Sequence, residues 1–104
     1  MAKTSEPKLG LAVMQVLASR PENKASVRTL IRYVPDFITL TAEDHNPSTI
    51  RKGEEMWEQR VRNLKSHDKA SGNVLAEGYV KHIRRAMYQL TKAGRLHLKN
   101  KGLL

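Results

Sequence analysis

The residues with the clearest capacity for chemistry are polar side chains within residues 54–66. Trp57, Val61 and Leu64 follow the i, i+4, i+7 spacing of one helical face, so we expect a helix over 54–66 that buries them. Its opposite face then carries amide, guanidinium and hydroxyl groups that can bond base edges and phosphates. The base-edge candidates are Gln59, Arg62, Asn63 and Ser66. The alternative is an ordinary solvated helix face, which needs no ligand.

A second set of candidates is basic. Arg84 and Arg85 stand between two short apolar segments, 79–83 and 87–90, that we predict to be the strands of a hairpin. An exposed Arg pair adds little stability but suits a minor groove or a phosphate. A charge that keeps an edge strand from pairing with other chains is the alternative. The candidates for contact with a nucleic-acid backbone are Arg51, Lys52, Arg60, Lys65, Lys69, Lys81, Arg84 and Arg85.

The charge of the chain is concentrated in its second half. The net charge is +9; residues 1–50 carry six Lys/Arg against five Asp/Glu, and residues 51–104 carry thirteen against five. Such asymmetry indicates a polyanionic partner, with nucleic acid ahead of an acidic membrane surface. The apolar runs are too short for a transmembrane segment, and the first residues lack the apolar run of a signal peptide. With no cysteine, the sequence fits a cytoplasmic protein without disulfides.

The elements that must position these residues can be predicted along the chain. Ser5 and Ser26 are expected to cap two helices that end near Pro21 and Pro35. A long connection, 36–53, then leads to the third helix, and turn residues lead on to the hairpin. Thr91 is expected to cap a short last helix, with Leu96 and Leu98 in the core. We therefore predict one α+β domain, mainly α, over 1–104, with a core of 5–98 and a frayed basic tail of 99–104.

Two motifs in this arrangement resemble a known family. The chain carries Thr91-Lys92-Ala93-Gly94-Arg95 after its last predicted strand, and this resembles the Thr-x-x-Gly-Arg ending of many winged-helix domains. The pattern from Trp57 to Asn73 is similar to the N-terminal domains of Mrr-like and HNH-type restriction endonucleases. The resemblance covers roughly residues 8–98. It implies a winged helix-turn-helix fold, in which helix 54–66 enters the major groove and hairpin 79–90 is the wing.

The likeness to restriction enzymes calls for a search for a nuclease site. Pro35-Asp36 is not followed by the Asp/Glu-x-Lys element that a metal-dependent nuclease requires. The consecutive residues Ser66-His67-Asp68 cannot easily align as a catalytic triad. The four histidines show no metal-ligand spacing: His45, His67, His82 and His97. We expect no catalysis, no metal and no cofactor.

The sequence thus predicts a non-catalytic DNA-binding module. It would be a small regulator, or the DNA-recognition part of a restriction-type system, and cytoplasmic, associated with a prokaryotic or viral nucleoid. Double-stranded DNA is the expected partner, and a homodimer or a separate effector subunit stays open. A winged-helix domain for protein interaction or targeting, without direct DNA binding, is the alternative. Binding of double-stranded RNA is a third interpretation.

Overall fold

The structure is a computed structural model that describes residues 2–104. This part of the chain forms four α-helices, two short 3-10 helices and three strands. Their order is α1 (Glu6–Ala18), η1 (Pro21–Asn23), β1 (Lys24–Ser26), α2 (Val27–Tyr33), η2 (Val34–Asp36), α3 (Met56–Arg62), β2 (Val80–Arg84), β3 (Met87–Leu90) and α4 (Lys92–Asn100). The strands make one antiparallel sheet in the order β1-β3-β2. The predicted α+β class, mainly α, is confirmed.

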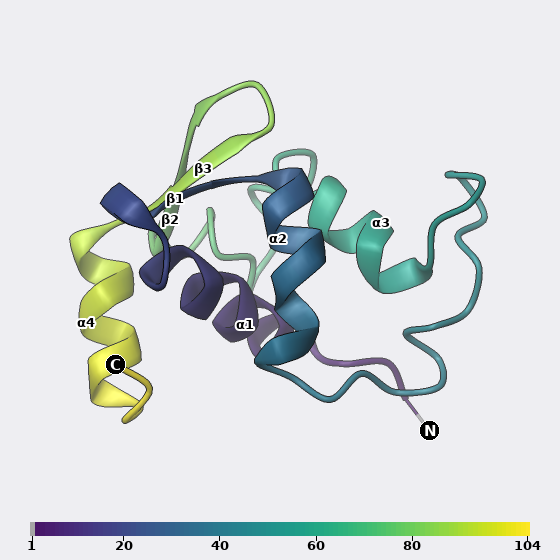
Figure 1. The fold of residues 1–104 in the computed structure, drawn as a ribbon, viewed down its shortest axis with the longest axis horizontal. Helices are drawn as coiled ribbons and strands as arrows, with labels where there is room; N and C mark the ends of the chain where they lie inside the picture. Colours follow the sequence, from purple (N-terminus) through teal and green to yellow (C-terminus); the bar gives the residue numbers. More distant parts are fainter. Residues whose placement is uncertain (1) are drawn as a thin grey trace.

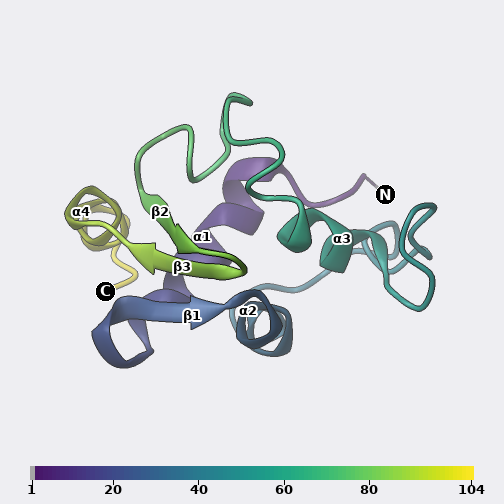
Figure 2. The ribbon, with the colours of Figure 1, turned by 90° about the horizontal axis from the view of Figure 1, so that it is seen from above.

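The helices surround one core, and the hairpin projects from it. α3 and α4 lie at opposite ends, with α1, α2 and the sheet between them (Figures 1 and 2). The hairpin of β2 and β3 rises above the helices, and the long connection from η2 forms the outer edge beside α3 (Figure 1). Each helix and the sheet contribute buried side chains, among them Leu9, Val13, Leu17, Leu30, Val34, Trp57, Val61, Tyr88 and Leu98.

The first two helices begin where the sequence predicts. The Ser5 hydroxyl accepts a hydrogen bond from the N–H of Lys8 at 3.3 Å, and the Ser26 hydroxyl accepts one from Thr29 at 3.1 Å. Both bonds satisfy backbone donors that a helix start leaves without partners. Ser26 also ends β1, which pairs with β3 and so joins the start of α2 to the sheet.

α3 is shorter than the predicted helix 54–66, which is wrong at both ends. Its start is set by a capping box, in which a Glu58 side-chain oxygen accepts the N–H of Glu55 at 3.0 Å. The helix ends at Arg62, with Asn63 as its C-cap, and turns follow. The side-chain amide of Asn73 donates to the carbonyl of Leu64 at 3.2 Å, so a later segment supplies a partner that a longer helix would have supplied.

The predicted hairpin is present, with a two-residue turn. Arg84 pairs with Met87, and the register shifts between His82 and Arg84. Ala86 has a φ of 58°, in the left-handed region that disfavours residues with a Cβ. Its carbonyl accepts the N–H of Val27 at 2.9 Å, which attaches the turn to the first residue of α2.

The Thr91–Arg95 motif has a structural explanation. The Thr91 hydroxyl accepts the N–H of Gly94 at 3.0 Å and donates to the carbonyl of Gly78 at 2.7 Å. It therefore caps α4 and ties this helix to the entrance of β2. At Gly94 a Cβ atom would lie 2.1 Å from the carbonyl oxygen of Tyr79, so only glycine lets α4 approach this closely.

One of the two leucines expected in the core from α4 lies outside it. Leu98 is fully buried, but the side chain of Leu96 is 58% exposed. Leu96 and Leu98 are two positions apart, and residues with that spacing lie about 200° apart around a helix axis. They therefore cannot both face the core. The prediction for Leu96 is wrong for this reason.

Residues 99–104, predicted as a frayed tail, include the end of α4 and a closed turn after it. After α4 ends, Gly102 adopts a φ of 73° and donates its N–H to the carbonyl of Lys99 at 3.0 Å. Leu103 donates to the carbonyl of Leu98 at 2.9 Å. These two bonds form a Schellman motif, which closes the helix end.

Replacement of Gly94 tests the close contact between α4 and the sheet. We expect Gly94→Ala to lower the free energy of unfolding by roughly 2 kcal/mol, because backbone must move to admit the new methyl group. Chemical denaturation followed by circular dichroism measures this loss. An exposed helical glycine would instead gain about 1 kcal/mol on the same change. A stabilised Gly94→Ala protein would therefore contradict the close packing of Gly94 against Tyr79.

Candidate nucleic-acid interface

α3 is held against the core by its predicted buried face. Trp57, Val61 and Leu64 are all buried, as the spacing predicted. The indole N–H of Trp57 donates to the Glu55 carboxylate at 2.9 Å. The same carboxylate contacts the ring of His45 at 2.7 Å. The His45 contact is the main reason why the pKa of Glu55 is lowered from its ordinary value. These bonds fix the first turn of α3, so its other side faces away from the core.

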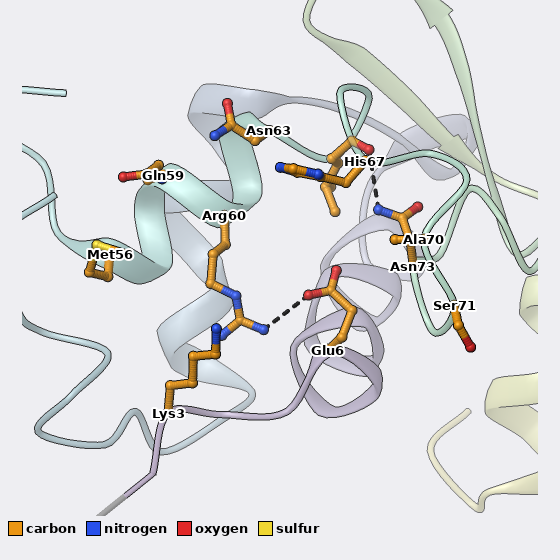
Figure 3. A pocket seen from close by; sticks show the side chains of 11 residues that line it. Lys3, Glu6, Met56, Gln59, Arg60, Asn63, His67, Ala70, Ser71 and Asn73 are labelled. Atoms are coloured by element: carbon orange, nitrogen blue, oxygen red, sulfur yellow. Dashed lines mark hydrogen bonds and ion pairs between the residues drawn. The ribbon is translucent and has the colours of Figure 1, made fainter. Parts of the chain in front are cut away.

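Two of the four base-edge candidates lie together on that outer side. Gln59 and Asn63 are one helical turn apart and line a hollow of about 370 Å³. The hollow is bordered by His67 from the turn after α3 and by Lys3 from the segment before α1 (Figure 3). Ser66 is exposed, but it lies in the turn beyond the helix end. The structure therefore brings Gln59 and Asn63 together and moves Ser66 off the helix.

Gln59 and Arg62 are both held by the connection that precedes α3. The Ser48 hydroxyl donates to the side-chain oxygen of Gln59, and the Nε of Arg62 donates to the carboxylate of Glu54. Arg62 is bound through Nε, so its two terminal amino groups keep donors for a further partner. The two side chains are oriented before any ligand arrives.

Arg60, predicted to contact a backbone phosphate, is bound within the fold. Its side chain is 14% exposed, and it donates to the carbonyl of Thr4 at 2.7 Å and to the carboxylate of Glu6 at 3.0 Å. Figure 3 shows its guanidinium turned toward Glu6 and Lys3, away from Gln59. Arg60 thus joins α3 to the N-terminal segment; it borders the same hollow as Gln59 and Asn63, but its charge is paired with Glu6.

Asp44 completes this internal network. Its side chain is 1% exposed and lies 3.8 Å from the guanidinium of Arg60. Burial raises the pKa of Asp44, but hydrogen bonds from the Thr4 hydroxyl and from the N–H groups of Thr41 and Thr4 outweigh that effect. The net result is a pKa below the ordinary value, so the carboxylate stays charged in the folded protein. The sequence did not predict this network, because Thr4, Asp44 and Arg60 lie far apart in the chain.

Lys65 and Lys81 share one hollow between the turn after α3 and strand β2. Together with His82 and Asp68 they line a space of about 390 Å³. Lys65 contacts Asp68 at 2.7 Å, which raises the pKa of Lys65 and lowers the pKa of Asp68. The structure therefore brings two of the predicted phosphate contacts together at the base of the hairpin.

The hairpin is coupled to the α3 region by Tyr88. Burial raises the pKa of the Tyr88 hydroxyl, and a hydrogen bond from the backbone N–H of Lys65 partly offsets this effect. The ring of Tyr88 also contacts the ring of His82, with centroids 5.3 Å apart. The hairpin thus packs against the turn after α3.

Most of the other predicted cations are exposed and unpaired. Within residues 2–104, six of them are exposed and take part in no ion pair: Arg51, Lys52, Lys69, Lys81, Arg84 and Arg85. Arg28 is a further exposed cation that the sequence did not single out. It follows Val27, whose N–H donates to the carbonyl of Ala86 in the hairpin turn.

Comparisons with known proteins add no family to these observations. No family model matches the chain, and neither the curated proteins nor the solved structures yield a match. Among residues 2–104, no three His, Cys, Asp or Glu side chains are grouped so that they could hold a metal ion. The helices of the same residues include none with the length and apolar character needed to cross a membrane.

The Asp44 network makes a testable statement about stability and pH. Because the pKa of Asp44 is lower in the folded than in the unfolded chain, its stabilising effect is present above the unfolded value of about 3.9 and is lost as the pH falls through the folded value. We expect Asp44→Asn to cost about 2 kcal/mol at neutral pH, since charged hydrogen bonds are lost. The difference from wild type should shrink in acid.

Denaturant unfolding at a series of pH values measures this difference. Glu43→Gln is the matched control, because it removes a neighbouring carboxylate that is exposed. A stability gap for Asp44→Asn that stays constant down to pH 2, or an equal gap for Glu43→Gln, would contradict the role given to Asp44.

Proposed function

We propose that this protein is a non-catalytic, double-stranded DNA-binding module of the winged-helix type. The observation that carries the proposal is the outer face of α3, with Gln59, Arg62 and Asn63, lying beside a projecting hairpin with two exposed arginines. The order of elements, with a three-stranded sheet that includes a short strand between the first two helices, supports the winged-helix part of the proposal.

In this proposal α3 enters the major groove and the hairpin lies along the neighbouring backbone. Gln59 and Asn63 can bond adenine edges, and the terminal amino groups of Arg62 can bond guanine. The phosphate contacts would be made by Arg51, Lys52, Lys65, Lys69, Lys81, Arg84 and Arg85. Ser66 would reach a phosphate from the turn, and Arg60 would serve the fold. Such a module acts as a small regulator or as the recognition part of a restriction-type system.

A protein-interaction domain is the second candidate, and exposed leucines favour it. Leu96, Leu103 and Leu104 are 58%, 40% and 53% exposed near the C-terminal end of the chain. Exposed apolar groups of this kind can mark a partner surface. Salt separates the two candidates, because binding to DNA weakens steeply with ionic strength while an apolar interface does not.

The hairpin provides the first test. We expect Arg84→Ala with Arg85→Ala to weaken binding to every duplex sequence and to flatten the log–log salt dependence by about two units. Fluorescence anisotropy of a labelled random 20-base-pair duplex at several salt concentrations measures both effects. The wild-type slope should lie between about −4 and −7 for the proposed phosphate contacts.

A matched double variant separates local contact from overall charge. Lys99→Ala with Lys101→Ala removes the same charge from the end of α4, away from the hairpin (Figure 1). It should change binding far less. No wild-type binding at low salt would reject the DNA proposal, and equal losses in the two double variants would reject the hairpin as a contact.

Arg62 provides a test of sequence recognition. We expect Arg62→Ala to cost roughly 1–3 kcal/mol on a duplex selected from a random library, and less on unselected duplex, if its terminal amino groups bond a guanine. Competition anisotropy with both duplexes measures the two losses. Equal losses would show that Arg62 contacts the backbone and not a base.

A further inference from the structure

The connection before α3 contains the most exposed large apolar side chain among residues 2–104. Ile50 is 72% exposed, and its neighbours Arg51 and Lys52 are exposed as well. A single exposed apolar residue is common on protein surfaces and needs no ligand. The question is therefore whether the chain around Ile50 is built to present it.

The chain around Ile50 is closed into a small ordered loop, residues 47–55. Pro47 and Glu55 form an isolated antiparallel bridge, and the N–H of Ser48 donates to the carbonyl of Glu54 at 2.8 Å. Inside the loop the Ser48 hydroxyl accepts the N–H of Ile50 at 3.1 Å and of Arg51 at 2.9 Å. The backbone at Ile50 is thus bonded in place, which reduces the conformational entropy that binding would have to remove.

The 47–55 loop is attached to the residues proposed to read bases. Ser48 contacts Gln59 and Glu54 contacts Arg62, so both ends of the loop are bonded to the outer face of α3. α3 lies between this loop and the hairpin in both views of the fold (Figures 1 and 2). A duplex that receives α3 would therefore meet the hairpin on one side and the loop on the other.

We infer that the 47–55 loop is a second DNA-contacting element. This inference rests on the proposed function. Arg51 and Lys52 contact phosphates, and Ile50 enters the minor groove next to the major groove occupied by α3. An apolar side chain flanked by cations is the combination that minor-groove proteins use to wedge between base steps. The positive neighbours oppose association of Ile50 with another copy of this basic chain and favour a polyanion.

The inference predicts a specific loss for Ile50→Ala. Removal of a side chain that becomes partly buried in the groove should weaken binding by about five- to tenfold. The same change should abolish the rise in fluorescence of 2-aminopurine placed in TA steps of an A·T-rich duplex, because these steps unstack easily. Arg51→Ala with Lys52→Ala should flatten the salt dependence by about two units.

Leu96→Ala is the matched control. It removes another strongly exposed apolar side chain, from α4 at the opposite end of the molecule. Its affinity and its 2-aminopurine signal should equal those of wild type. Both positions are exposed, so circular dichroism should show that each variant is folded.

The outcomes distinguish this inference from the proposed function. If wild type binds the duplex and Arg84→Ala with Arg85→Ala weakens binding, but Ile50→Ala matches wild type, only the inference fails. If wild type does not bind the duplex at low salt, both fail. Phosphatidylserine vesicles provide the last arm: vesicle binding that Ile50→Ala abolishes, with duplex binding unchanged, would assign the loop to a membrane surface instead.

Discussion

The position of α3 depends on one buried carboxylate. Asp44 accepts hydrogen bonds from Thr4 and Thr41, while its own carbonyl accepts the N–H of Trp57 at 3.1 Å. Arg60 lies against the same carboxylate from the side of α3. An interior charge is tolerated only when such partners surround it. The N-terminal segment, the long connection and α3 must therefore take their places together.

This constraint matters because α3 cannot stand alone. It spans seven residues, and a helix of that length is marginal in water without tertiary contacts. Burial of Trp57 and Val61 and the capping box at its start supply those contacts. The outer side of α3 is in turn oriented by the connection, through the Ser48 and Glu54 contacts. Helix and connection are thus bonded to each other at the outer side of α3.

The basic residues show how the fold divides side chains of one type among several roles. Arg60 is bonded within an internal network, and Arg62 is oriented by a carboxylate while keeping donors available. Lys65 forms an ion pair with Asp68. Arg84 and Arg85 remain exposed on the hairpin. A count of charges identifies the basic half of the chain, but the effective surface charge depends on which cations have partners within the fold.

The sequence by itself determined the features that depend on neighbours in the chain. Helix caps such as Ser5 and Ser26, the buried spacing of α3 and the strands of the hairpin follow from contacts within a few residues. Only the tertiary structure decided where α3 ends, what Arg60 binds and how residues 47–55 present Ile50. In each case the partner is distant in the chain or outside a regular element: Asn73 for Leu64, Thr4 for Arg60 and α3 for the loop. Periodicity carries no information about such partners, because it records only which face of an element is apolar.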